Sequence, residues 1–287
     1  MIRIVESLRD FGSMNAGTIR YSNLTEEDKK MLCARHNITL KELEDYDLTH
    51  DKKELFAIHR KKFGARMGFD GRRMFMADQE HKTGSHFEIT EEYVHENPEG
   101  WTDIPEDILV VRSNLPGVVI GHPVADCPVV MLSDRKNGIT AIGHCSGEMV
   151  DHHLPEMIME VLRRDYGSRA EDIFAYISAS VGDGWTYDCF PKWAKDMKVW
   201  DHAIMMGEDG LFHISLKPAI LKQLILAGVE REKMLFSMDD TSKDPNYYSH
   251  SVASSKENPD PSKFGRHFAG MFYTEDGQDD VEIRKGR

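Results

Sequence analysis

The sequence lacks the features that mark several classes of protein. Its cysteines form no CxxC pair, which argues against a zinc ribbon and a disulfide framework. They are Cys33, Cys127, Cys145 and Cys189. No apolar run is long enough to span a bilayer, and the first residues hold no apolar core of a secretory signal. We therefore expect a cytoplasmic protein with reduced thiols and no membrane partner.

Basic charge is also scarce. The 287 residues include 49 acidic and 36 basic side chains, which give a formal net charge of -13. A surface of this sign repels a phosphate backbone, so we expect no nucleic-acid partner. A small polar substrate in a locally positive pocket remains compatible with this charge. The hydrophobic content of 40% is enough for a sizeable core.

Short apolar segments separated by turn residues predict strands. These segments are residues 74–77, 108–112, 118–121, 129–132, 139–143 and 174–179. Several are apolar throughout, as expected for strands that are buried on both faces. The Asn137-Gly138 pair predicts a hairpin between two of them.

Helices are predicted before and after this group of strands. Thr25 with Asp28, and Asp51 with Glu54, have the spacing of a capping box at a helix start. Apolar residues at helical spacing predict further helices over residues 150–162 and from Pro218 to Gly228. Because the strands cluster instead of alternating with helices, we predict an α+β class with mixed β-sheets flanked by helices.

We expect one domain over residues 1–287. Residues 1–50 are predicted to form a helical N-terminal preamble, and the charged residues 274–287 a frayed tail. The polar segment 239–265 is predicted to be a long loop, and such loops are often functional.

Three segments place a reactive side chain where a strand begins or ends. They carry His81, Cys127 and His144. Two imidazoles and a thiolate can hold zinc with one open position, which lowers the pKa of a bound water. Alternatively, the imidazoles can lower the pKa of the thiol and orient it as a nucleophile. A lone buried cysteine or histidine is more often structural, so the residues alone leave these alternatives open.

A longer pattern resembles the signature of the laccase-domain family. Residues 125–132 read Ala-Asp-Cys-Pro-Val-Val-Met-Leu, and residues 141–144 read Ala-Ile-Gly-His. The family's Gln-x-His segment is matched by Gln79-Glu80-His81. Weaker similarities keep the same order along the chain, at Thr18-Ile19-Arg20, Tyr248-Ser249-His250 and Gly265-Arg266.

This family has been described as multicopper polyphenol oxidoreductase-like, and a fold of the cysteine-hydrolase-like type is expected for it. Purine nucleoside phosphorylase, adenosine deaminase and peptidoglycan-editing roles have been assigned to its members. The resemblance implies a catalytic metal site, zinc in preference to copper, whose ligands are His81, Cys127 and His144. It also implies four substrate contacts, which are Arg20, Gln79, Tyr248 and Arg266. The implied partners are a small nucleoside and phosphate, with the two arginines as the anion site.

The chain departs from the family pattern after His144. It reads Cys-Ser-Gly-Glu-Met at residues 145–149, where the family has Ala-Gly-Trp-Arg-Gly. The missing arginine and the added Glu148 predict altered substrate contacts in a divergent member. Four-copper oxidation is disfavoured, because the 14 histidines include no His-x-His pair.

Three hypotheses follow from the sequence. The first is a purine nucleoside-processing enzyme that carries out phosphorolysis of adenosine-, inosine- or guanosine-type nucleosides, adenosine deamination, or both. The second is a Cys-His amide hydrolase of the peptidoglycan-editing type, and the third is a non-catalytic metal-binding module. Polyphenol oxidation ranks last, and the sequence makes no prediction of oligomeric state.

Overall fold

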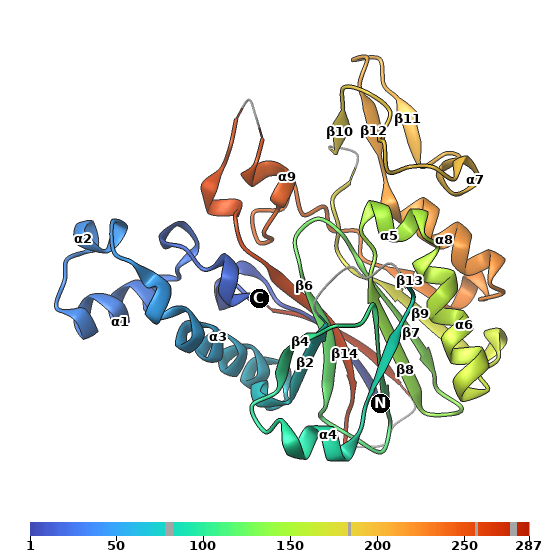
Figure 1. Ribbon diagram of the computed structural model, residues 1–287, viewed down its shortest axis with the longest axis horizontal. Helices are drawn as coiled ribbons and strands as arrows, with labels where there is room; N and C mark the ends of the chain where they lie inside the picture. The colour runs from blue at the N-terminus through green and yellow to red at the C-terminus, as the bar shows by residue number, and fades with distance from the viewer. Residues whose placement is uncertain (78–82, 183–184, 256–257, 276–279, 287) are drawn as a thin grey trace.

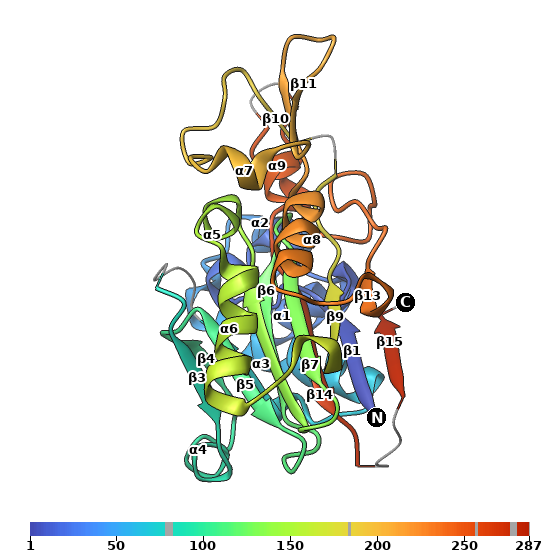
Figure 2. The ribbon, with the colours of Figure 1, turned by 90° about the vertical axis from the view of Figure 1, so that its right-hand side faces the viewer.

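The computed structural model describes residues 1–77, 83–182, 185–255, 258–275 and 280–286. Over these residues, two six-stranded mixed sheets pack face to face, and helices cover the outer face of each sheet (Figure 1 and Figure 2). The chain therefore forms four layers in the order helix, sheet, sheet, helix. The predicted α+β class with mixed sheets flanked by helices is confirmed.

We call the first sheet sheet A. Its strands, in spatial order, are β15 (Val281–Lys285), β1 (Ile2–Glu6), β14 (His267–Tyr273), β6 (Val119–Val124), β2 (Met74–Ala77) and β4 (Trp101–Ile104). On its outer face lies α3 (Lys52–Met67), with α1 (Glu26–His36) and α2 (Leu40–Glu44) beyond it (Figure 1). Side chains alternate along β6, so Val119 packs toward these helices while Ile120 faces the other sheet.

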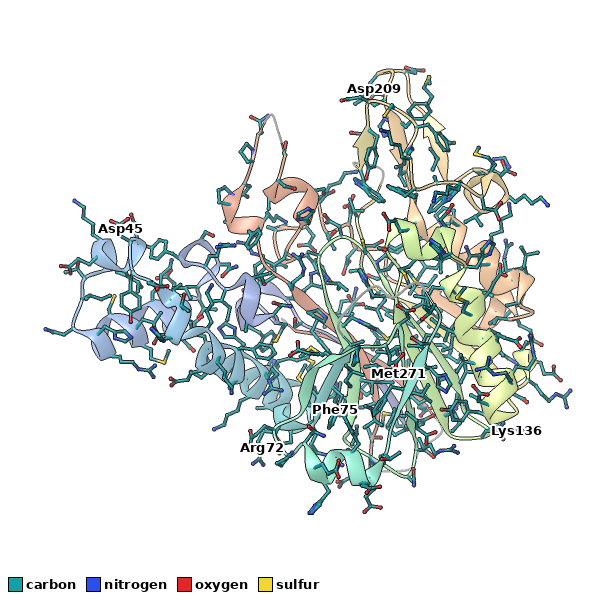
Figure 3. The ribbon with its side chains drawn as sticks, viewed as in Figure 1. Asp45, Arg72, Phe75, Lys136, Asp209 and Met271 are labelled. Carbon is teal, nitrogen blue, oxygen red and sulfur yellow. The ribbon has the colours of Figure 1, made fainter. Side chains whose placement is uncertain are left out.

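The second sheet, sheet B, has the spatial order β13 (Met234–Phe236), β9 (Ile173–Ile177), β7 (Val129–Asp134), β8 (Ile139–His144), β5 (Ile108–Arg112) and β3 (His86–Ile89). Its outer face is covered by α5 (Gly147–Asp151), α6 (Leu154–Tyr166) and α8 (Leu216–Leu226). The layer between the sheets is apolar over most of its area, and Phe75 and Met271 lie in it (Figure 3). Burying this apolar layer is a main source of the fold's stability.

The remaining elements lie at the periphery. A small sheet of β10 (Thr186–Tyr187), β12 (Phe212–Ile214) and β11 (Ile204–Met206) projects beyond α5 and α8 together with α7 (Met197–Trp200) (Figure 1). Two short helices, α4 (Glu91–Glu96) and α9 (His250–Ala253), lie in connections. Among the described residues, no helix has both the length and the apolar character needed to cross a membrane.

The predicted strands and hairpin are confirmed. The six predicted strand segments correspond to β2, β5, β6, β7, β8 and β9. Strands β7 and β8 pair antiparallel with Asp134 opposite Ile139. The Asp134 carboxylate accepts hydrogen bonds from the backbone N–H groups of Lys136 and Asn137, both at 3.0 Å, and Gly138 takes a positive φ of 66°. This turn therefore fixes the register that brings β8 to the site described below.

Three predictions need correction. Residues 1–50 do not form only a helical preamble, because β1 lies inside sheet A between β14 and β15. The tail is not frayed throughout, since β15 pairs in parallel with β1. The single helix predicted over residues 150–162 is divided into α5 and α6 at His153, whose φ is 60°, and Pro155 lies in the first turn of α6.

The helical layer on sheet A depends on a buried polar pair. Thr25 and Asp28 form the predicted capping box of α1, and the Asp28 carboxylate also lies 3.0 Å from Nε2 of His59 on α3. Nδ1 of His59 lies 3.0 Å from the backbone oxygen of Ser13. Burial by itself raises the pKa of Asp28, but the hydrogen bond and charge of His59, with the bonds from Thr25, leave this pKa below its ordinary value.

We therefore expect Asp28→Asn to lower the free energy of unfolding by about 1–3 kcal/mol at pH 7. A carboxylate with a lowered pKa stabilises the fold above its ordinary pKa, and this contribution is lost as the pH falls through the lowered value. The difference between wild type and variant, measured by urea unfolding, should be full at pH 7 and smaller in acid. Glu26→Gln, at an exposed position of the same helix turn, loses only a surface ion pair with Lys29 and should lower the free energy of unfolding much less than Asp28→Asn does. An equal stability of Asp28→Asn and wild type at pH 7 contradicts this account.

Candidate functional site

The chain crosses from one sheet to the other at one end of the sandwich. Strand β6 of sheet A ends at Val124, and β7 of sheet B begins at Val129, so residues 125–128 bridge the two layers. In the ladders at this end, His144 is the partner of Val129, and His267 is the partner of Val124. The crossing, the end of β8 and the start of β14 therefore meet. This places Cys127, His144 and Arg266 on neighbouring strand ends.

The crossing is held by the carboxylate of Asp126. This residue takes a positive φ of 84°, which is uncommon for a residue with a side chain. Its carboxylate accepts a hydrogen bond from the Thr241 hydroxyl at 2.7 Å and another from the Ser251 backbone N–H at 2.6 Å. Its backbone oxygen accepts the N–H of Val181 at 2.8 Å. Asp126 is therefore a positioning residue that fixes the backbone next to Cys127.

Arg266 faces this crossing from the start of β14. Its backbone N–H donates to the Ser13 hydroxyl at 3.1 Å, and its backbone oxygen accepts the N–H of Met14 at 2.8 Å. Burial lowers the pKa of Arg266, and its electrostatic interactions with Cys127 and Asp126 oppose that shift. The guanidinium thus interacts electrostatically with Cys127. A substrate anion bound beside Cys127 would interact with the same guanidinium.

His144 ends β8 inside the layer between the sheets. It is 8% exposed, and its Nδ1 is buried without a hydrogen-bond partner among the described residues. Burial, followed by the nearby charges of His122 and Arg266, lowers the pKa of His144 to about 3. The imidazole is therefore neutral at pH 7, which is the form that coordinates a metal ion or accepts a hydrogen bond.

Two further histidines in this layer were not predicted as site residues. His122, on β6, has its ring centroid 6.0 Å from that of His144 across the layer. His267, on β14, packs edge-on against Tyr247 with ring centroids 5.0 Å apart. Both are buried, neither forms a side-chain hydrogen bond within the described chain, and burial is the largest cause that lowers the pKa of each to about 3. The available signal for His122 was a histidine inside an otherwise apolar strand five residues before Cys127.

The structure describes two more of the predicted substrate contacts, Arg20 and Tyr248. Arg20 is exposed, and its guanidinium lies 4.9 Å from the ring centroid of Phe264. Tyr248 is buried, and its ring packs against Gly265, beside Arg266, and under the Arg9 guanidinium. Predicted residues Gln79 and His81 lie outside the described residues.

The donor atoms present fit part of a metal site. Cys127 and His144 supply a sulfur and a neutral imidazole, which are donors that zinc accepts. Within the described ranges, no three histidine, cysteine or acidic side chains gather closely enough to hold a metal ion. The third ligand predicted from the family resemblance, His81, falls outside those ranges, so the complete set remains a prediction.

The segment after His144, where the chain departs from the family pattern, starts a short helix. The Ser146 hydroxyl accepts the N–H of Met149 at 3.3 Å and caps α5. A Cβ atom at Gly147 would lie 2.8 Å from the ring of Trp193, so only glycine fits there without displacing that ring. Burial raises the pKa of the Cys145 thiol, which is packed in the core. Cys145 is thus a packing residue next to the site.

Comparisons with known proteins agree with this architecture. The model of a family described as "Multi-copper polyphenol oxidoreductase laccase" matches residues 39–273. "Adenosine deaminase RL5", from an unknown prokaryotic organism, is 29% identical over 131 residues, which are 43% of this chain and 47% of that protein. This match spans about half the length of that relative.

Two solved structures have a similar fold. Bacillus licheniformis hypothetical protein YfiH gives a TM-score of 0.63 at 20% identity, over 77% of this chain and 82% of that chain. YlmD from Geobacillus stearothermophilus gives a TM-score of 0.62 at 17% identity, over 78% of this chain and 82% of that chain. At these identities the likeness concerns the fold alone.

We expect Thr241→Val to lower the free energy of unfolding by about 1–3 kcal/mol, because it leaves one oxygen of the buried Asp126 carboxylate without its donor. Thr241→Ser keeps the hydroxyl and should retain most of that stability. Urea unfolding of the three proteins measures the difference. If Thr241→Val is as stable as wild type, the hydrogen bond from Thr241 to Asp126 contributes nothing to the fold.

Proposed function

Because the chain belongs to the multi-copper polyphenol oxidoreductase laccase family, we propose that it is a purine nucleoside-processing enzyme that cleaves nucleosides with phosphate, deaminates adenosine, or both. One observation carries the proposal. Cys127, His144 and the half-buried Arg266 meet at the end of the sandwich where the chain crosses between the sheets. The name of the relative "Adenosine deaminase RL5" supports the choice of substrate class.

We propose zinc as the metal, held by Cys127, His144 and His81. The sulfur of Cys127 and the neutral imidazole of His144 are suitable donors, and the low pKa of His144 keeps that ring available for coordination at neutral pH. When bound, zinc would supply Lewis-acid activation of a water molecule for attack on the purine ring.

The residues of the chain have separate tasks in this proposal. Arg266 binds the anion, phosphate in phosphorolysis, by charge-assisted hydrogen bonds. Asp126 holds the backbone of the crossing so that the Cys127 side chain keeps its position. The apolar layer behind His144 excludes water, which strengthens the electrostatic contacts that Arg266 makes with a bound anion. Because the family's arginine after His144 is absent, Arg266 carries more of the anion binding in this chain.

The metal part of the proposal predicts that zinc content depends on Cys127 and His144. Purified wild type should hold about one zinc per chain, and Cys127→Ser and His144→Ala should lose most of it, because removing one of three protein ligands leaves too few donors. Elemental analysis after gel filtration measures this content. Cys189→Ser, which changes an exposed thiol, is the matched control and should retain the metal. Zinc retained at wild-type levels in both site variants would exclude this site.

The catalytic part predicts turnover of adenosine or inosine. Products resolved by chromatography should include a free base that requires phosphate, or inosine formed from adenosine without phosphate. Cys127→Ala should reduce either activity at least 100-fold, because removing a group that acts in the transition state typically lowers the rate by roughly that factor or more. Arg266→Met should raise the KM for phosphate roughly tenfold or more while affecting deamination less.

The alternative hypotheses give different results in the same assays. Amide hydrolysis that survives a chelator and is lost after thiol alkylation would favour the Cys-His hydrolase. Bound zinc with no turnover of any nucleoside would favour a metal-binding module. Either result would replace the proposal of a purine nucleoside enzyme.

A further inference from the structure

A cavity lies on the helix-covered side of sheet A. Its volume is about 640 Å³, within the range of small-molecule sites. Its chemistry is set by Phe56 and Arg60 from α3, Met76 from β2, Glu99 from the connection before β4, Asp103 from β4, and Pro123 from β6. Met76 belongs to the core between sheet A and the helices, whereas the apolar layer behind His144 is the one between the two sheets. The cavity thus lies on the opposite face of sheet A from that layer.

Arg60 is the unusual side chain of this cavity. It is only 8% exposed, and within the described chain its Nε and Nη1 atoms are buried without a hydrogen-bond acceptor. The guanidinium stays in place by lying 4.8 Å from the ring centroid of Phe56. Burial lowers the pKa of Arg60, and the charges of Glu99 and Asp70 oppose this shift. By contrast, the partly buried Arg3 is paired directly with Glu282 at 2.8 Å.

The sealed Nε and Nη1 atoms are a cost to the fold, whereas Nη2 of Arg60 is not among these sealed atoms and is the donor that a ligand in the cavity can reach. A carboxylate offers two oxygens to the N–H groups of a guanidinium, which is a strong charge-assisted pair. The walls formed by Phe56, Met76 and Pro123 suit an apolar body. Glu99 and Asp103 line the same cavity and balance the charges of Arg60 and Lys53. The apolar walls therefore decide the preference, and they favour a carboxylate with an apolar body over phosphate.

We propose that this cavity binds a small monocarboxylate with an apolar body, its carboxylate on Arg60. The site is separate from that of the proposed purine chemistry and does not depend on it. Benzoate is a suitable probe because it joins one carboxylate to one flat apolar ring.

Isothermal titration of the full chain tests the site. Benzoate should bind wild type, and its affinity should fall roughly tenfold or more in Arg60→Met. Arg72→Met is the matched control, since Arg72 is a nearby arginine that lies on the surface, 63% exposed and paired with Asp70 (Figure 3). This variant has the same loss of charge and should bind benzoate as wild type does. Inorganic phosphate should bind more weakly than benzoate.

Two further measurements separate a binding role from a structural one. The thermal midpoint of Arg60→Met should equal or exceed that of wild type, because the substitution removes unpaired buried donors. Asp103→Asn, at an exposed position, should strengthen benzoate binding by roughly twofold through the loss of a repelling charge.

The proposal is overturned by any of four results. They are the absence of saturable benzoate binding to wild type, equal binding by Arg60→Met and wild type, tighter binding of phosphate than of benzoate, and a lowered thermal midpoint of Arg60→Met. A lowered thermal midpoint would show that Arg60 stabilises the fold by packing on Phe56, which is a structural role and not a ligand-binding one. Failure of the nucleoside assays leaves these outcomes unaffected.

Discussion

The candidate site depends on one buried carboxylate at the point where the chain passes between the sheets. Asp126 bonds to the Thr241 hydroxyl and to the Ser251 backbone, two groups from the long polar segment that follows β13. These bonds hold a residue of positive φ between β6 and β7, and so set where Cys127 lies relative to the ends of β8 and β14. The same two bonds fasten the polar segment 239–251 to the sandwich. The Lys263 ammonium adds hydrogen bonds to the backbone oxygens of Thr241, Asp244 and Tyr247, so a segment with the composition of a loop has a defined position.

The histidines near this point are costly to the fold. A buried polar group without a partner destabilises a protein by about 1–3 kcal/mol, and native structures contain few of them. Here His122, His144 and His267 all have unpaired ring nitrogens inside one apolar layer, as far as the described residues extend. Alternation along β6 and β8 directs His122 and His144 toward each other from opposite sheets. Two imidazoles therefore meet at the end of the apolar layer where Cys127 and Arg266 also lie.

The sequence alone predicted the interior strands and the family. It did not predict the edge strand β15 or the histidines that lie near His144. Apolar runs such as residues 129–132 are recognisable because both faces are buried, and Asn137-Gly138 identified the hairpin. Strand β15 has a charged composition typical of a solvated tail, and its strand state comes only from backbone pairing with β1. His122 could not be assigned to the site, because its proximity to His144 arises from the packing of two sheets and not from spacing along the chain. Tertiary contacts therefore decided the features that local patterns missed.

Arg266 links the proposed metal site to the proposed binding of phosphate. Its guanidinium is close to Asp126, yet both oxygens of that carboxylate already accept hydrogen bonds from Thr241 and Ser251. Its Nη1 donates to the backbone oxygen of Gly265 at 2.8 Å, which leaves other donors of the guanidinium for a ligand. The interaction of Arg266 with Cys127 remains. In the proposed enzyme Cys127 would help to hold the metal ion, which would leave the free donors of Arg266 for an anion. This local positive charge would let a chain with a net charge of -13 bind phosphate at this point.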